Sequence, residues 1–110
     1  MKKILILFVS IFSFTFSSDY IPNEVDCLVI KEENSIICKY ISNRTSDDRF
    51  INVEWISPDK EISRTRKILF PSGHGSVYDF RYLSGREIGE WSFKVTDGDE
   101  VFSTKFEVTE

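Results

Sequence analysis

The feature that most constrains the fold is an alternation of apolar and polar residues on both sides of a turn near the C-terminus. Segments 89–95 and 101–108 flank the turn Thr96–Glu100, in which Asp97-Gly98 supplies a residue that tolerates positive φ. Pairing Val95 with Phe102 places Trp91 opposite Phe106, so one register sends every large apolar side chain to the same face. We therefore expect a β-hairpin whose apolar face the rest of the chain must cover. The side chains on that face are Trp91, Phe93, Val95, Phe102, Phe106 and Val108.

A second hairpin carries both cysteines of the chain. Segments 25–31 and 36–41 flank the turn Glu32-Glu33-Asn34-Ser35, and centring the pairing on that turn places Cys27 opposite Cys38. A disulfide can close there if the two residues form a non-hydrogen-bonded pair, which has the shorter Cα separation. Two buried free thiols are the alternative.

The N-terminus resembles a targeting segment. Met1-Lys2-Lys3 is followed by an almost unbroken apolar run from Ile4 to Phe16 and then by small residues. This pattern predicts a secretory signal peptide over 1–17 and a single domain over 18–110. An uncleaved membrane anchor is the alternative, but the apolar run is shorter than the roughly 20 residues that span a bilayer.

The charge of the remaining 93 residues argues against two classes of partner. The leader contains two of the 14 basic residues, which leaves 12 against 18 acidic residues and a formal charge of −6. Nucleic acid and anionic membrane surfaces both need a positive footprint. We therefore expect no nucleic-acid partner, and no stable membrane insertion once the signal peptide is removed.

Three central segments also read as strands. Phe50–Ile56 places Ile51, Val53 and Trp55 on one face. Glu61–Phe70 is interrupted by four polar residues, Arg64-Thr65-Arg66-Lys67, which we interpret as a solvated sheet edge whose charges discourage edge pairing. A polyanion-binding patch is the alternative for those charges. Ser76–Leu83 places Tyr78, Phe80 and Tyr82 on one face.

These segments add up to about seven short strands with turn signals between them and no helical periodicity, which predicts an all-β sandwich. From residue 35 to residue 108 the order of residues resembles an immunoglobulin-like domain. The segments that carry the resemblance are Ile36–Tyr40, Asn52–Trp55, Val77–Leu83 and Glu87–Phe93. The resemblance implies about seven antiparallel strands, a core in which Trp55 and Phe93 meet across the sandwich, and a non-catalytic recognition or adhesion function.

Two residues depart from that family's pattern. Trp91 stands at the position of the corner tyrosine, where an indole N–H could partly replace the usual hydroxyl. Phe93 stands where the second cysteine would be, so no disulfide can link the two sheets, and Cys38 is left to pair with Cys27. We expect Trp55, Trp91, Phe93 and Phe106 to form the core.

The sequence offers little for catalysis. His74 is the only histidine, and it lies between two glycines in the loop 71–75 beside Ser72 and Ser76, without the context of a nucleophile. No cluster of metal ligands or phosphate loop is present, so we expect no enzyme activity, cofactor or metal. Asn43-Arg44-Thr45, in the polar loop 42–48, is a glycosylation sequon in a eukaryotic host.

We therefore expect a secreted domain that binds another protein or a cell-surface molecule. One alternative is a bacterial periplasmic accessory domain that binds an envelope protein or a glycan. Another is a small secreted enzyme inhibitor that uses the loop Ser72–Ser76 as its blocking segment. The expected contact regions are the loop Asn43–Asp48, the loop Ser72–Ser76 and the charged edge Arg64–Lys67.

Overall fold

The computed structural model describes residues 22–110; the predicted signal peptide lies outside this range. A short 3-10 turn, η2 (Lys31–Glu33), joins the first two strands. The strands, in chain order, are β1 (Glu24–Ile30), β2 (Ser35–Ile41), β3 (Arg49–Ile56), β4 (Ile62–Phe70), β5 (Ser76–Tyr82), β6 (Gly89–Asp97) and β7 (Glu100–Val108).

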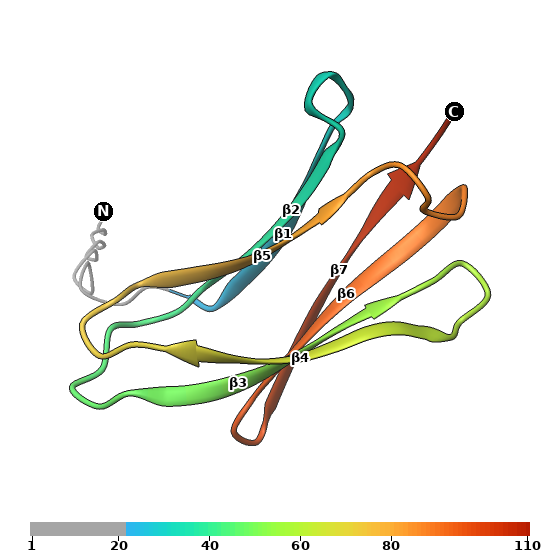
Figure 1. Ribbon diagram of the computed structural model, residues 1–110. Coiled ribbons are helices and arrows are strands. Elements are labelled where there is room, and N and C mark those ends of the chain that lie inside the picture. The colour runs from blue at the N-terminus through green and yellow to red at the C-terminus, as the bar shows by residue number, and fades with distance from the viewer. Residues whose placement is uncertain (1–21) are drawn as a thin grey trace, which may run out of the picture.

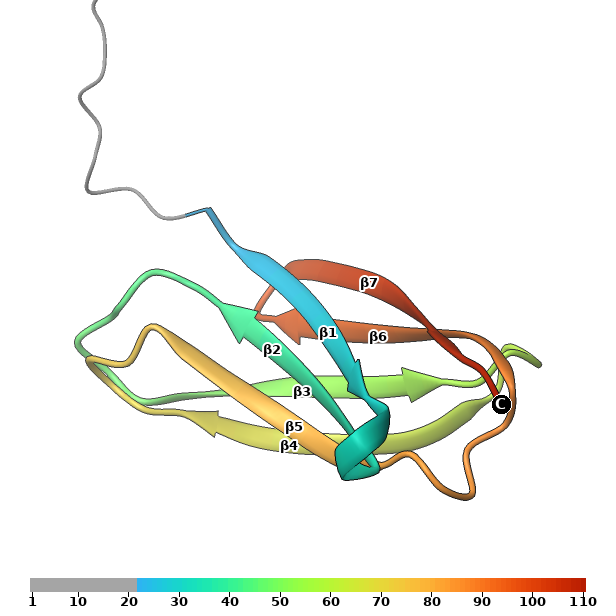
Figure 2. The same cartoon turned by 90° about the horizontal axis from the view of Figure 1, so that it is seen from above.

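The strands form two sheets that pack face to face (Figures 1 and 2). One sheet has the order β1-β2-β5 and the other the order β4-β3-β6-β7, with every pairing antiparallel. The predicted all-β sandwich of seven antiparallel strands is confirmed. Strands β4 and β5 are the open edges of their sheets, and β1 and β7 are the edges at the other side.

The C-terminal hairpin has the predicted register. Val95 pairs with Phe102 and Trp91 pairs with Phe106, as the alternation of apolar residues required. Gly98 adopts a φ of 62°, a conformation that glycine reaches without the strain a Cβ would bring.

The cysteine hairpin also has the predicted register, and Cys27 is bonded to Cys38 across it. Their Cα atoms are 4.0 Å apart, the close approach of a non-hydrogen-bonded pair. The turn differs in detail from the expectation, because η2 begins one residue earlier, at Lys31, and Ser35 already belongs to β2. Asn34, between them, takes the left-handed conformation. By the chain-entropy model a loop this short contributes roughly 2 to 3 kcal/mol of stability.

The core lies between the sheets and contains all four of the expected aromatic residues. The Trp55 and Phe93 rings meet edge to face with centroids 5.1 Å apart, and Trp55 meets Phe106 in the same manner at 5.9 Å. The expectation that Trp55 and Phe93 meet across the sandwich is wrong. They are register partners on the neighbouring strands β3 and β6, so their side chains lie beside each other on the inner face of one sheet.

Trp91 makes the corner bond that the sequence left open. Its Nε1 donates to the carbonyl oxygen of Glu87, four residues upstream, at 2.8 Å. Gly89, between them, has a φ of 135°, and a Cβ there would lie 2.9 Å from Cγ of Pro58. Close packing of the β3–β4 turn therefore requires glycine at this corner.

Candidate functional site

The two open edges, β4 and β5, lie side by side and are joined by side chains rather than by a β ladder. Arg64 on β4 donates from Nη1 to the carbonyl oxygen of Phe80 on β5 at 3.3 Å. Arg81 on β5 donates from Nη1 to the hydroxyl of Ser63 on β4 at 3.1 Å. Arginine side chains thus bridge the seam between the sheets and cover part of the exposed β5 backbone.

Beneath this seam, a buried carboxylate ties one sheet to the other. Asp79 on β5 has a side chain that is 1% exposed. Its Oδ2 accepts a hydrogen bond from Nε1 of Trp55 on β3 at 2.8 Å, and its Oδ1 accepts one from Nη1 of Arg66 on β4 at 2.6 Å. The amide of Phe80 also donates to Oδ1, at 3.0 Å. Burial of this carboxylate is sustained because each oxygen receives at least one donor.

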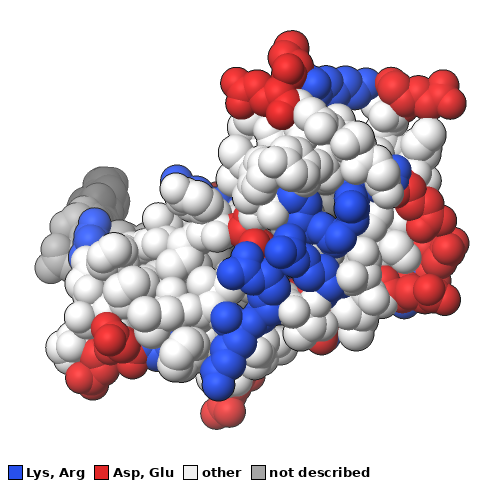
Figure 3. Space-filling view, in the orientation of Figure 1, with Lys and Arg blue, Asp and Glu red and all other residues white. Residues whose placement is uncertain are grey.

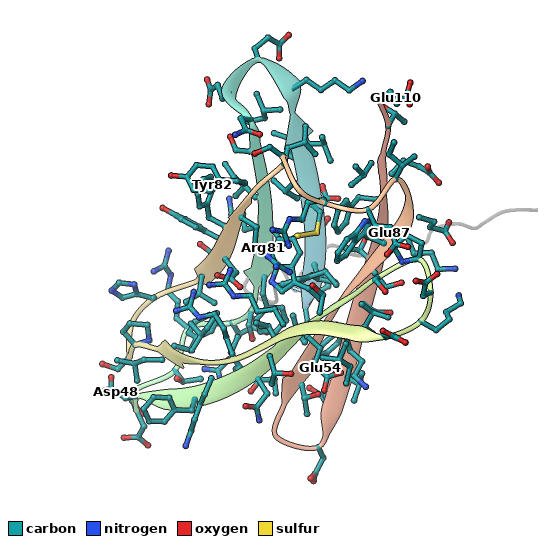
Figure 4. All side chains as sticks on the ribbon, turned by 45° about the vertical axis from the view of Figure 1, so that its right-hand side comes forward. Asp48, Glu54, Arg81, Tyr82, Glu87 and Glu110 are labelled. Carbon is teal, nitrogen blue, oxygen red and sulfur yellow. A yellow bond between two sulfur atoms is a disulfide. The ribbon has the colours of Figure 1, made fainter. Side chains whose placement is uncertain are left out.

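At the seam is a pocket of about 400 Å³, lined by Arg64, Phe80, Arg81, Tyr82 and Arg86. Arg81 points into the space between the sheets, whereas its neighbour Tyr82 points away from it (Figure 4). The Arg81 guanidinium lies 5.3 Å from the centre of the Trp55 ring. Burial lowers the pKa of Arg81, and the positive charges of Arg86 and Arg64 lower it further. Three guanidinium groups therefore face one small volume.

The three arginines of the pocket have no ion-pair partner within 4 Å among residues 22–110. Nε of Arg86 is buried and has no hydrogen-bond partner within that same range. Figure 3 shows a band of basic side chains across this face of the molecule, with acidic side chains gathered toward its ends. The edge charges that the sequence indicated at 64–67 are thus joined by Arg81 and Arg86 from farther along the chain.

Besides the buried Asp79, three acidic side chains lie near Arg86. A second hollow is lined there by several residues, among them Asp59, Glu61 and Glu87. Partial desolvation raises the pKa of Glu87, as do a hydrogen bond to Asp59 and the charges of Asp59 and Glu61. This carboxylate cluster bounds the positive region on one side and limits the length of an anion that can lie along it.

The outer face of the β1-β2-β5 sheet is apolar beside this pocket. The aromatic row of β5 that the sequence indicated faces outward, with Tyr78 66%, Phe80 43% and Tyr82 62% exposed. The Phe80 and Tyr82 rings meet edge to face at 5.3 Å. In the sheet register Leu28, Ile37 and Phe80 stand in one line across the three strands, which extends the row into a patch. We call Leu28, Ile37, Tyr78, Phe80 and Tyr82 the aromatic face.

A second polar tie between the sheets lies at the opposite end of the sandwich core. The hydroxyl of Tyr40 on β2 donates to Oδ2 of Asp97 on β6 at 2.7 Å. Arg49 on β3 donates to both oxygens of the same carboxylate, from Nε to Oδ1 at 3.0 Å and from Nη2 to Oδ2 at 2.9 Å. These hydrogen bonds, led by those from Arg49, lower the pKa of Asp97. Burial first, and then the hydrogen bond to Asp97, raises the pKa of Tyr40. Arg49 also stacks over the Phe70 ring at 4.3 Å, so the whole tie is packed as well as charged.

The two loops expected to bind partners lie against each other. Arg44 donates to the carbonyl oxygen of Gly73 at 2.5 Å, and the amide of Gly73 donates to the carbonyl oxygen of Thr45 at 2.8 Å. The amide of Ser72 donates to Asp48 at 2.8 Å. His74 is exposed, and Asn43 is half-buried where the first loop leaves β2. Loops 42–48 and 71–75 thus form one hydrogen-bonded surface unit.

Within residues 22–110 no group of three or more His, Cys, Asp or Glu side chains converges as metal ligands would. The same residues contain no helix that is long and apolar enough to cross a bilayer. The disulfide is typical of proteins that mature in an oxidising compartment such as the cell exterior or the periplasm.

The parts of the site that depend on inward-pointing charges were not predicted from the sequence. Asp79 lies between Tyr78 and Phe80, and the aromatic alternation drew attention to the wrong face of β5. Arg86 lies in the loop after β5, where a single arginine carries no pattern. The one available signal was that Asp79 and Arg81 share the face opposite to the aromatics, which makes that face charged and in need of partners.

A scan against models of known protein families gives no match to this sequence. A search of curated proteins gives no match either.

Proposed function

We propose that this chain is an exported, non-catalytic recognition domain of immunoglobulin-like type that binds another protein through the aromatic face and the arginine pocket beside it. The observation that carries the proposal is the composition of that surface. Tyrosine and arginine are enriched among the residues that dominate binding energy at protein interfaces, and here they lie exposed on two adjoining rigid strands.

The immunoglobulin-like assignment rests on connectivity and on the corner. Taking β1 to β7 as strands A to G, sheets of order A-B-E and D-C-F-G differ from the constant-type domain in one strand, because the fourth strand joins the third instead of the fifth. Trp91 fills the role of the corner tyrosine through its bond to Glu87. The disulfide lies within one sheet, between strands A and B, instead of joining B to F across the sandwich as in that family. The Trp55–Asp79 hydrogen bond links the sheets through strands C and E.

The export assignment rests on the leader-like segment 1–17 together with the disulfide. A secreted domain in a eukaryotic host would carry a glycan at Asn43, whereas a bacterial periplasmic domain would not. Intact-mass measurement of the exported form separates the two hosts, because a glycan adds mass that an enzymatic deglycosylation removes.

The test is a capture experiment from the exported fraction with matched variants of the purified domain 18–110. Tyr78→Ser/Tyr82→Ser removes the two most exposed aromatics of the face. Phe50→Ser/Val101→Ser removes two similarly exposed apolar side chains on β3 and β7 as a control. We expect the first pair to abolish capture of a partner that the wild type and the control pair retain. Equal capture by all three proteins would contradict the assignment of the face.

The absence of catalysis is tested in parallel. Ser72→Ala/His74→Ala removes the only serine–histidine neighbourhood that the sequence offers. We expect the wild type to show no hydrolysis of generic ester and peptide substrates. Hydrolysis by the wild type that disappears in the double variant would replace recognition with an enzymatic function.

An inhibitor is the second candidate, and one observation favours it. A blocking loop must hold its shape against a protease or other enzyme, and Gly73 is fixed on both its amide and its carbonyl by loop 42–48. In that case capture would survive Tyr78→Ser/Tyr82→Ser and be lost when residues 72–75 are replaced by a flexible segment of equal length.

A further inference from the structure

We propose that the pocket formed by Arg64, Arg81 and Arg86 is a carboxylate-binding subsite that receives a short acidic segment of the partner protein. The inference rests on the proposed function, since it names the chemistry of the protein that the domain recognises. It assigns a role to three arginines that have no acidic partner within 4 Å among residues 22–110.

The fold does not need Arg64 or Arg81 to neutralise the buried carboxylate of Asp79. Asp79 already receives Trp55 Nε1, Arg66 and a backbone amide, so it has no need of Arg64 or Arg81. The bonds of Arg64 and Arg81 go instead to a carbonyl and a hydroxyl, neither of which carries a charge. Arg81 lies in the field of Asp79, but that carboxylate is already paired with Arg66. The pocket therefore keeps a net positive charge, and a bound anion relieves the repulsion among its arginines.

Arg86, which lines the same pocket, also has a donor without an acceptor among residues 22–110. Nε of Arg86 is out of contact with solvent and has no acceptor among the described residues. A buried N–H without an acceptor costs roughly 1 to 3 kcal/mol. An anion that enters the pocket offers acceptor oxygens to the guanidinium of Arg86 as well as to those of Arg64 and Arg81.

The negative charge around the pocket favours a short anionic ligand over a long one. The chain as a whole is acidic, with 18 Asp and Glu against 14 Lys and Arg, and the carboxylates of Asp59, Glu61 and Glu87 border the pocket beyond Arg86. A long polyanion such as a sulfated polysaccharide would run from the positive band into this negative one. A short run of Asp or Glu side chains fits the local charge, and the neighbouring Phe80 and Tyr82 supply the apolar contact that a peptide backbone and its side chains can use.

The test is a titration with a hexaglutamate peptide, followed by NMR of the domain and by anisotropy of a labelled peptide. We expect saturable binding that shifts the resonances of Arg64, Arg81 and Tyr82 and weakens as the salt concentration rises. Arg64→Gln and Arg86→Gln should each weaken binding by about tenfold, the value of one charge-assisted hydrogen bond. Lys67→Gln is the matched control, because Lys67 lies on the same strand but over the Phe50 ring, and it should change binding by less than about twofold.

Three results would overturn the inference: no binding of the peptide, equal binding by all variants, or tighter binding of a sulfated hexasaccharide or of inorganic phosphate than of hexaglutamate. Wild-type resonance shifts keep the test valid if a variant does not fold. Capture of a partner that persists in Arg64→Gln and Arg86→Gln but not in Tyr78→Ser/Tyr82→Ser would reject the pocket while leaving the recognition function in place.

Discussion

The two polar ties between the sheets are built from the same parts but lie in different surroundings. Asp79 receives an indole N–H and an arginine, and Asp97 receives a phenol O–H and an arginine. The Asp79 side chain is 1% exposed and the Asp97 side chain 12% exposed. Their arginines differ in the opposite sense, since Arg66 is 46% exposed and Arg49 only 25%. The more deeply buried carboxylate, Asp79, therefore depends mainly on the neutral indole N–H of Trp55. The less buried one, Asp97, depends mainly on its two hydrogen bonds from the partly buried Arg49.

The difference has an energetic meaning. When a carboxylate is removed, a partner that can turn to water loses little, whereas a buried donor is left without an acceptor and costs its full desolvation. Trp55 and Tyr40 are both buried, but an indole N–H is fixed in its ring whereas a hydroxyl proton can rotate to another acceptor. The tie at Asp79 is therefore the more fragile of the two. Four experiments test this ranking, in order of the effect expected.

Phe93→Ala measures how much apolar packing in the core contributes to stability, for comparison with the two polar ties. Phe93 is 1% exposed and packs against Trp55, so its truncation should lower the free energy of unfolding by roughly 3 to 5 kcal/mol. Lys94→Ala is the control, because this partly exposed side chain pairs with Glu54 at 3.5 Å and should cost less than about 1 kcal/mol. Urea denaturation measures both, and similar losses would mean that the faces of β6 are assigned wrongly.

Asp79→Ala should lower the free energy of unfolding by about 2 to 3 kcal/mol, because it leaves the Trp55 N–H without an acceptor in the core. Asp79→Asn keeps an acceptor oxygen and should recover part of the loss. Exposed Asp26 on β1 provides the control, and Asp26→Ala should change stability by less than about 0.5 kcal/mol. A loss no larger than that of Asp26→Ala would show that the buried tie contributes nothing net.

Asp97→Ala should cost less, about 1 to 2 kcal/mol, because Arg49 reaches water and the Tyr40 hydroxyl proton can rotate away from the lost acceptor. The measurement is again urea denaturation at neutral pH. If Asp97→Ala proves more damaging than Asp79→Ala, charge pairing outweighs depth of burial and the ranking of the ties is reversed.

The smallest effect is the pH dependence of the Asp97 tie. Its pKa is lowered in the folded state, so its stabilisation is present above the unfolded pKa, about 3.9, and is lost as the pH falls through the folded value. Between pH 6 and pH 2 the wild type should therefore lose more stability than Asp97→Asn, by on the order of 1 kcal/mol. Parallel stability curves for the two proteins would show that the carboxylate is not held ionised by the fold.

Much of the fold follows from local pattern. Alternation of apolar and polar residues is enough to set the registers of both hairpins, because a slip of one residue would turn Trp91 or Cys38 to the wrong face. The edge position of β4 was predictable from its charges, since such residues keep strand edges from pairing.

Of the candidate site, the sequence indicated the charges at 64–67 and the row of aromatic residues on β5, but not that this row faces outward. The other residues of the site are placed by which face of β5 turns inward. Hydrophobicity alone predicts that the face with Tyr78, Phe80 and Tyr82 is buried and that the face with Asp79 and Arg81 is exposed, which is the reverse of the structure. The choice is decided by Trp55, whose buried N–H needs the acceptor that Asp79 supplies. The relative placement of Trp55 and Phe93 was mistaken for a related reason, because alternation gives the face of a strand but not the sheet to which it belongs.

The disulfide within one sheet also determines how the domain would respond to tension. A pulling force applied at Asn23 and Val108 acts on β1 in one sheet and β7 in the other. The disulfide carries that force directly from Cys27 to Cys38, so the chain between these two cysteines, which are eleven residues apart, is not stretched. About 35 Å of chain then stays unextended until the bond is reduced. In a reducing solution a stretched molecule would lengthen by that additional step, so the domain would report the redox state of its surroundings as a change in its fully extended length.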